Sequence, residues 1–282
     1  MFIVDVLKSI LFGIIEGITE WLPISSTGHM ILLERICHFN NVSEGFFDMY
    51  LVVIQLGAIL AVAVMFWNKL FPFKRVVDEN GVKGKLRVRK PVVNLWLKVL
   101  FASIPAGVIG ILLNDVLDKY LYNYITVAIT LIVYGVLFII VEILNKKRKP
   151  KVRKLGEVTF KNAFIVGLFQ VLSLIPGTSR SGSTILGGIT IGNSRRVASE
   201  FTFFLAVPAM LGASAVKLIG FGGLPNVREL VLLLDGMITA FAVSLLVIRF
   251  LMNYIKKHNF NAFGVYRILL GAIVLTVYFV TK

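Results

Sequence analysis

Long apolar runs alternate with short polar segments along most of the chain. Six of the runs have close to the roughly 20 residues that a helix needs to cross a bilayer. They cover residues 46–68, 92–113, 123–144, 197–219, 229–254 and 262–281. This pattern predicts an all-α polytopic membrane protein with six transmembrane helices.

Two further regions look like membrane segments that are interrupted by a polar turn. Residues 2–22 are long enough to cross, yet they include Asp5, Lys8, Glu16, Thr19 and Glu20. A turn and about ten mostly apolar residues follow, enough for roughly 15 Å of helix, or half a membrane. Residues 160–175 and 183–192 repeat this design. We therefore expect two re-entrant helical hairpins, with polar turns at a depth where only protein or a wet cavity can satisfy the backbone.

Composition agrees with a membrane protein. Hydrophobic residues make up 57% of the 282 residues, and the mean hydropathy is +0.85. The first residues do not form a cleavable signal, because they lack a basic start and a small-residue cleavage site. Cys37 is the only cysteine, so the sequence predicts no disulfide within the chain.

The net charge of +15 gathers in two segments, since residues 69–90 and 146–161 carry eight Lys or Arg side chains each. The positive-inside rule places both segments in the cytoplasm, where they could also attract anionic lipid head groups. The charge of every other loop agrees with this placement, which leaves both termini outside. Nucleic-acid binding is disfavoured, because no stacking aromatic residues accompany the basic residues.

The two halves of the chain resemble each other. Aligning Pro23 with Pro176 places Ser26 on Ser179, and a nearly equal offset places Phe46 on Phe201. Each half holds one hairpin and three spans, and because three is odd, the second half is inverted. Broken helices in inverted repeats are typical of secondary transporters. The expected organisation is a single membrane domain, 1–282, with repeats at about 1–145 and 160–282 and a basic linker at about 146–159. Chance alignment of apolar sequence is the alternative.

The first turn, "EGITEWLPISSTGH", carries a pair of carboxylates and a pair made of a hydroxyl group and a histidine. Glu16 and Glu20 are four residues apart and share a helix face. Ser26 and His29 are three residues apart, a spacing that lets two side chains meet. Such groups are costly in a membrane and usually face a cavity or a partner. A cluster with a purely structural role is the alternative interpretation.

The second turn, "PGTSRSGST", is rich in hydroxyl groups. Gly177 and Gly182 have the spacing of a P-loop, but Ser183 stands where that motif has lysine, and no strand precedes the turn. A helix N-terminus and the Arg180 guanidinium group would instead form a phosphate cradle. Two carboxylates that could hold a divalent cation, and a hydroxyl beside a histidine, complete a constellation for phosphoryl transfer from a diphosphate. The apolar surroundings suggest a lipid substrate.

These two turns resemble the signature motifs of the bacterial undecaprenyl-diphosphatase family, of the bacitracin-resistance type. The segments "IQLGAILAVAVMFW" at 54–67 and "ASEFTFFLAVP" at 198–208 also look like family segments, and the resemblance runs essentially end to end. It implies removal of the terminal phosphate of undecaprenyl diphosphate at the outer face of the bacterial cell membrane. That reaction recycles the lipid carrier for peptidoglycan synthesis and confers resistance to bacitracin.

The resemblance also implies which residues form the site. It assigns catalysis to Ser26, His29, Glu20 and Arg180. Phosphate binding is expected from Arg180, Ser179, Gly177, Ser181, Thr184, Ser25 and Thr27. Glu16 and Glu20 are the expected ligands of a divalent cation, Mg²⁺ with Ca²⁺ as the other candidate. Attack by Ser26, with His29 as its base, and attack by an activated water both stay open.

Two other functions compete with this interpretation. A transporter or flippase for an anionic prenyl-phosphate lipid would use the same inverted-repeat site without cleaving its ligand. A phosphatase of the type-2 phosphatidic acid phosphatase class would need a second catalytic histidine, and neither His38 nor His258 lies in such a motif. The sequence also leaves open the preferred prenyl chain length and whether the protein forms a homodimer.

Overall fold

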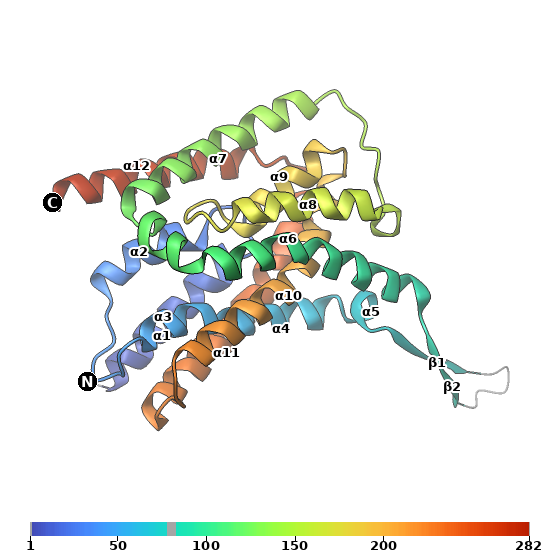
Figure 1. Cartoon of the computed structure of the whole chain (residues 1–282). Coiled ribbons are helices and arrows are strands. Elements are labelled where there is room, and N and C mark those ends of the chain that lie inside the picture. The colour runs from blue at the N-terminus through green and yellow to red at the C-terminus, as the bar shows by residue number, and fades with distance from the viewer. Residues whose placement is uncertain (1, 78–82, 282) are drawn as a thin grey trace.

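The structure, a computed structural model, describes residues 2–77 and 83–281 and is mostly helical (Figure 1). The helices are α1 (Phe2–Thr19), α2 (Ser26–Ile36), α3 (Phe46–Val53), α4 (Gln55–Met65), α5 (Trp67–Leu70), α6 (Lys90–Leu121), α7 (Tyr124–Asn145), α8 (Phe160–Leu172), α9 (Arg180–Thr190), α10 (Arg195–Gly220), α11 (Val227–Tyr254) and α12 (Asn261–Val280). A short 3-10 turn, η1 (Leu155–Glu157), precedes α8.

The prediction of six membrane spans is confirmed. Among the described residues, six helical stretches are long and apolar enough to cross a bilayer: Phe46–Met65, Lys90–Leu113, Tyr124–Asn145, Arg195–Gly220, Val227–Tyr254 and Asn261–Val280. The first span is α3 and α4 together, with a break at Ile54 that the sequence pattern did not predict. The helices α1, α2, α8 and α9 are not among these spans, and α2 and α9 have 11 residues each.

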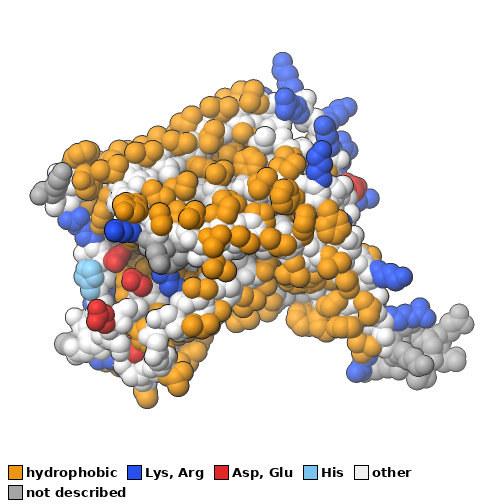
Figure 2. All heavy atoms as spheres, viewed as in Figure 1, with side chains coloured by type: hydrophobic (Ala, Val, Ile, Leu, Met, Phe, Trp, Pro, Cys, Tyr) orange, Lys and Arg blue, Asp and Glu red, His pale blue; other side chains and the backbone are white. Residues whose placement is uncertain are grey.

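Part of the first basic segment forms a β-hairpin that the sequence analysis treated as a loop. Strand β1 (Phe73–Val77) pairs antiparallel with β2 (Lys83–Val88). Figure 1 places this hairpin and the connection between α7 and α8 at one end of the molecule, and both termini at the opposite end. Lys and Arg side chains crowd the end with the hairpin (Figure 2).

At this end the exposed Glu157 carboxylate accepts the backbone N–H groups of Arg153 and Lys154, and these hydrogen bonds lower its pKa.

The long helices pack closely because glycines let their backbones approach each other. A Cβ atom built on Gly135 of α7 would lie 2.7 Å from the carbonyl oxygen of Gly264 in α12. A Cβ atom on Gly57 of α4 would lie 2.0 Å from the carbonyl oxygen of Met237 in α11. These contacts fix the helix pairs that frame the polar turns.

We expect Gly57→Ala to destabilise the protein. The added methyl group would overlap the backbone of α11, and overpacking of this kind costs about 1–3 kcal/mol. The midpoint of thermal unfolding in detergent should therefore fall. Gly212→Ala in α10 is the matched control, because nothing lies within 4 Å of the added atom. Equal unfolding midpoints for the two variants would contradict the packing described here.

Candidate active site

The two polar turns lie against each other, although they are about 150 residues apart in the chain. The first turn connects α1 to α2, and the second connects α8 to α9. One guanidinium nitrogen of Arg180 lies 2.7 Å from a carboxylate oxygen of Glu20. The Ser181 hydroxyl also donates to the carbonyl oxygen of Leu22 at 3.3 Å. The structure therefore brings together the two clusters that the sequence analysis joined on chemical grounds.

Each short helix begins with a serine cap in an unusual conformation. Ser25 has a φ of 74° and Ser179 a φ of 70°. Each side chain accepts the backbone N–H three residues on, from Gly28 at 3.3 Å and from Gly182 at 3.1 Å. Positive φ is strained for a residue other than glycine, and such strain gathers at functional sites. Ser25 and Ser179 thus have the same role in the two turns, each as the N-cap of a short helix.

Aligning the two turns on these caps pairs Ser26 with Arg180, whereas the alignment on the prolines pairs Ser26 with Ser179. Pro23 lies two residues before its cap, whereas Pro176 lies three residues before its own. The second turn thus holds one residue more than the first, and an alignment anchored on the prolines loses register at the caps. With the caps paired, Ser26 corresponds to Arg180, and each is the first residue of its helix.

Glu20 lies at the centre of the site. Its second carboxylate oxygen accepts the hydroxyl of Ser26 at 3.2 Å, while the first binds Arg180. Arg180 also donates to the carbonyl oxygen of Thr202 at 3.1 Å and lies over the ring of Trp21, 5.9 Å from its centroid. A hydroxyl, a carboxylate and a guanidinium group are thus held in one hydrogen-bonded series.

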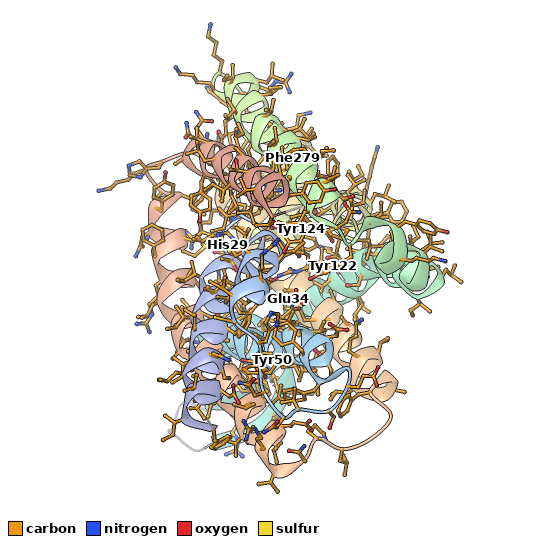
Figure 3. All side chains as sticks on the ribbon, turned by 90° about the vertical axis from the view of Figure 1, so that its left-hand side faces the viewer. His29, Glu34, Tyr50, Tyr122, Tyr124 and Phe279 are labelled. Carbon is orange, nitrogen blue, oxygen red and sulfur yellow. The ribbon has the colours of Figure 1, made fainter. Side chains whose placement is uncertain are left out.

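The expected hydrogen bond between Ser26 and His29 is not the one that the structure has. His29 Nδ1 lies 2.7 Å from the Ser25 carbonyl oxygen, and Nε2 lies 2.7 Å from the Tyr266 hydroxyl. The His29 and Tyr266 rings are also stacked, at a centroid separation of 5.7 Å. In Figure 3, which faces the end with both termini, His29 lies inside the ring of helices above Glu34 and Tyr50. The ring nitrogens of His29 thus bind Ser25 and Tyr266 rather than the Ser26 hydroxyl.

The other hydroxyl groups of the second turn differ in their availability. Thr184 is fully buried, where it donates to the carbonyl oxygen of Arg180 at 2.8 Å and accepts from Thr202. Its expected contact with phosphate is therefore not supported. Ser181 is buried as well, and its hydroxyl oxygen lies 3.2 Å from that of the half-buried Ser179. In the first turn Thr27, like Ser26, is half-buried.

Gly177 has a packing role in the second turn. Its φ is 86°, and a Cβ atom there would lie 2.2 Å from the hydroxyl oxygen of Thr130 in α7. That hydroxyl donates to the carbonyl oxygen of Pro176 at 2.7 Å. Glycine is therefore required both by conformation and by the close approach of α7.

Arg267 of α12 is a further residue of the site that the motifs in the sequence did not predict. This side chain is fully buried, and its guanidinium group binds both turns. It donates to the carbonyl oxygen of Pro23 at 3.3 Å, and to those of Gly177 and Thr178 at 2.8 and 2.9 Å. An arginine in the middle of a membrane span is itself a signal of function, and the last span carries it next to Tyr266.

The two expected metal ligands also lie together. Glu16 and Glu20 are both buried and lie one helical turn apart, since the backbone N–H of Glu20 donates to the carbonyl oxygen of Glu16 at 3.0 Å. Arg180 pairs with Glu20, whereas one oxygen of Glu16 is buried without a hydrogen-bond partner. Among the described residues no group of three or more His, Cys, Asp or Glu side chains could hold a metal. Because Mg²⁺ often uses one or two carboxylates together with water and substrate phosphate oxygens, the pair still fits such a cation.

Comparisons with known proteins agree over nearly the whole chain. The sequence model of the family described as "Bacitracin resistance protein BacA" matches residues 9–273, which include both turns. The undecaprenyl-diphosphatase of Acetivibrio thermocellus is 55% identical over 271 residues, which cover 96% of this chain and 97% of that protein. The undecaprenyl-diphosphatase of Enterococcus faecalis is 55% identical over 274 residues, 97% of each chain. The undecaprenyl-diphosphatase of Desulfitobacterium hafniense is 53% identical, and the matched residues cover 98% of this chain and 96% of that protein.

Proposed function

This chain belongs to the bacitracin resistance protein BacA family, and we propose that it acts as an undecaprenyl-diphosphatase. It removes the terminal phosphate of undecaprenyl diphosphate and leaves the monophosphate in the membrane. The observation that carries this function is the contact of Arg180 with Glu20 beside the Ser26 hydroxyl. It supports a site with a phosphate-binding group, a proton acceptor and a nucleophile at one point, in a chain more than 50% identical to curated enzymes of that name.

The chemistry follows from the donors and acceptors at that point. The terminal phosphate binds where the Arg180 fork and the start of α9 offer N–H groups to its oxygens. The Ser26 oxygen attacks phosphorus, its proton passes to the Glu20 carboxylate that already accepts it, and the bond to the bridging oxygen breaks. The monophosphate leaves with that oxygen. Water then hydrolyses the phosphoserine and releases inorganic phosphate.

Other residues of this chain prepare the site. Glu16, which has one carboxylate oxygen without a hydrogen-bond partner, would hold a divalent cation beside Glu20, and the cation when bound offsets negative charge on the diphosphate. His29 is held by the Ser25 carbonyl oxygen and the Tyr266 hydroxyl, and its role is to orient the cap of α2 that precedes Ser26. A water molecule in place of Ser26 as the nucleophile remains the competing mechanism.

The membrane arrangement completes the proposal. The paired caps at Ser25 and Ser179, each opening an 11-residue helix, support two re-entrant hairpins in an inverted repeat. The crowding of basic residues at one end supports a cytoplasmic location for that end. The termini then lie outside, and the site opens to the extracytoplasmic face of the bacterial cell membrane.

An assay of phosphate release tests this function. Full-length protein in detergent is incubated with undecaprenyl diphosphate and Mg²⁺, and inorganic phosphate is measured against a sample with a chelator. We expect sustained release that depends on the protein. Binding of the lipid without release of phosphate would instead favour a carrier of anionic prenyl lipids.

We expect Arg267 to act as a positioning residue. Arg267→Met leaves three carbonyl oxygens of the two turns without their donor, and a misplaced site commonly loses about 10²-fold in rate. The kcat for phosphate release should therefore fall by about that factor, with a smaller change in KM. Arg267→Lys keeps the charge and one or two hydrogen bonds, so it should restore part of kcat. If Arg267→Met unfolds the protein and Arg267→Lys has wild-type kcat, the residue is only structural.

A further inference from the structure

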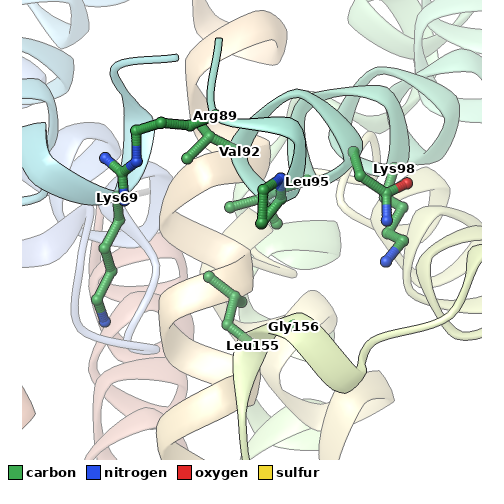
Figure 4. Close-up of a pocket in the computed structure, with 9 residues that line it drawn as sticks. Lys69, Arg89, Val92, Leu95, Lys98, Leu155 and Gly156 are labelled. Atoms are coloured by element: carbon green, nitrogen blue, oxygen red, sulfur yellow. The ribbon is translucent and has the colours of Figure 1, made fainter. Parts of the chain in front are cut away.

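A cavity of about 250 Å³ lies at the basic end of the molecule, apart from the two polar turns (Figure 4). It is formed by α5, the first turns of α6 and η1. Three cationic side chains, Lys69, Arg89 and Lys98, line it together with apolar groups of Val92, Leu95 and Leu155. In Figure 4 the side chains of Lys69 and Lys98 extend on either side of Leu155.

Lys98 is the unusual member of this cavity. Only 7% of the residue is exposed. Within the part of the chain that the structure describes, its ammonium group has no carboxylate or hydrogen-bond acceptor. Its one contact of note is the face of the Phe160 ring, 5.8 Å from the centroid. The residue is mostly buried, yet its Nζ atom is not among the fully buried polar atoms that lack a partner. The buried side-chain stem thus presents the ammonium group to the cavity, where an anion would neutralise its charge.

The surroundings add to this positive potential. Lys69 is half-exposed and pairs with Glu200 at 2.6 Å, a carboxylate that Arg196 also binds. Arg89 donates to the carbonyl oxygens of Asn68 and Phe71 and meets no acidic side chain among the described residues. It is also the N-cap of the 32-residue helix α6, whose N-terminal end is the positive end of the helix dipole. A phosphate group suits this cavity in charge and geometry.

A second cavity, also of about 250 Å³, borders the same two helices. Its lining is apolar and includes Trp67, Phe71, Trp96 and Val207. The indole N–H of Trp96 donates to the carbonyl oxygen of Leu70 at 2.8 Å. This hydrogen bond joins α5 to α6, the two helices that line both cavities. A cationic cavity with an apolar cavity beside it matches an amphiphile whose phosphate head continues into a hydrocarbon chain.

We propose that α5, α6 and η1 form a binding site for an anionic membrane lipid whose head group is a phosphate monoester, held by Lys98, Arg89 and Lys69 at the end opposite the termini. The Lys98 ammonium group and the Arg89 fork receive the phosphate oxygens. The lipid chain lies along Trp67 and Trp96. The catalytic turns contribute no residue to this site, so its occupancy does not depend on the phosphatase reaction.

Tryptophan quenching tests the proposal in the intact protein. Full-length protein is placed in phosphatidylcholine nanodiscs that contain increasing fractions of a brominated lipid, either phosphatidic acid or phosphatidylcholine. Bromine quenches only nearby indoles, and Trp67 and Trp96 line the apolar cavity, whereas Trp21 is fully buried elsewhere. We expect half-maximal quenching at a several-fold lower mole fraction with brominated phosphatidic acid than with brominated phosphatidylcholine.

Variants and a competitor decide the interpretation. Lys98→Gln should abolish the preference for phosphatidic acid and keep wild-type phosphate release from undecaprenyl diphosphate. Lys256→Gln removes an exposed lysine after α11 and is the control for net charge; it should leave the preference unchanged. An unchanged preference in Lys98→Gln, or an equal loss in Lys256→Gln, would overturn the proposal. If inorganic phosphate removes the preference and sulfate of equal ionic strength does not, the cavity binds free phosphate and the proposal of a lipid ligand is overturned.

Discussion

Replacing Ser26 with alanine is expected to lower the rate of phosphate release by about 10³-fold or more. The Ser26 hydroxyl donates to Glu20 at 3.2 Å, and the same carboxylate binds Arg180. The hydroxyl is thus aligned with a base and lies next to the phosphate-binding group. Removing a nucleophile that acts through a covalent intermediate typically leaves only the slow reaction of water in a preorganised site. Steady-state release of inorganic phosphate from undecaprenyl diphosphate measures the effect.

The control for this variant is a serine of another part of the membrane domain. Ser103 of α6 is also half-buried, and its hydroxyl donates to the carbonyl oxygen of Val99 at 2.9 Å. Ser103→Ala should keep wild-type activity. Mass spectrometry of the acid-quenched wild-type protein should also detect phosphate on Ser26 and none in the variant. Near-wild-type turnover by Ser26→Ala would establish water as the nucleophile and leave Glu20 as its base.

The membrane spans could be predicted because the thickness of the bilayer sets the length of an apolar helix that crosses it. Length and apolarity are therefore almost sufficient to identify a span. The span that was expected at 262–281 lies at Asn261–Val280 in the structure, and the one expected at 229–254 begins two residues earlier. The two turns were also visible in the sequence, since polar clusters between apolar runs are rare unless they do chemistry. The β-hairpin could not be predicted from composition, because its strands, Phe73–Val77 and Lys83–Val88, lie in a segment rich in basic residues.

The contacts inside the site could not be predicted from spacing. Ser26 and His29 have a spacing that lets side chains meet on a helix, but the cap at Ser25 turns Ser26 toward Glu20. That cap depends on a positive φ at a serine, which no local residue preference signals. Arg267 lies 244 residues from its partner Pro23. Only tertiary packing of α12 between the turns brings it there, although its place in an apolar span could have drawn attention to it.

Arg180→Ala is expected to lower kcat/KM by about 10³- to 10⁵-fold, the range found for arginines that stabilise a transferring phosphoryl group. The Arg180 side chain bridges the two halves of the site, from the start of α9 to Glu20 of the first turn. Its two terminal nitrogens bind Glu20 and Thr202, and its Nε atom is buried without a hydrogen-bond partner. The five N–H donors of the guanidinium group thus exceed the acceptors that the protein supplies, which favours a phosphate ligand. The same assay of phosphate release measures the loss.

Three further measurements separate binding of phosphate from support of the fold. Arg180→Lys keeps the charge beside Glu20 but not the planar fork, so kcat/KM should recover only in part. Free guanidinium ion at millimolar concentration should raise the activity of Arg180→Ala, because it can enter the space of the missing group, and it should not help Ser26→Ala. Arg196→Ala, which removes a largely exposed arginine paired with Glu200, should keep wild-type activity. If Arg180→Lys is fully active, or Arg180→Ala loses less than about tenfold, then charge near Glu20 is sufficient and the fork does not hold the phosphate.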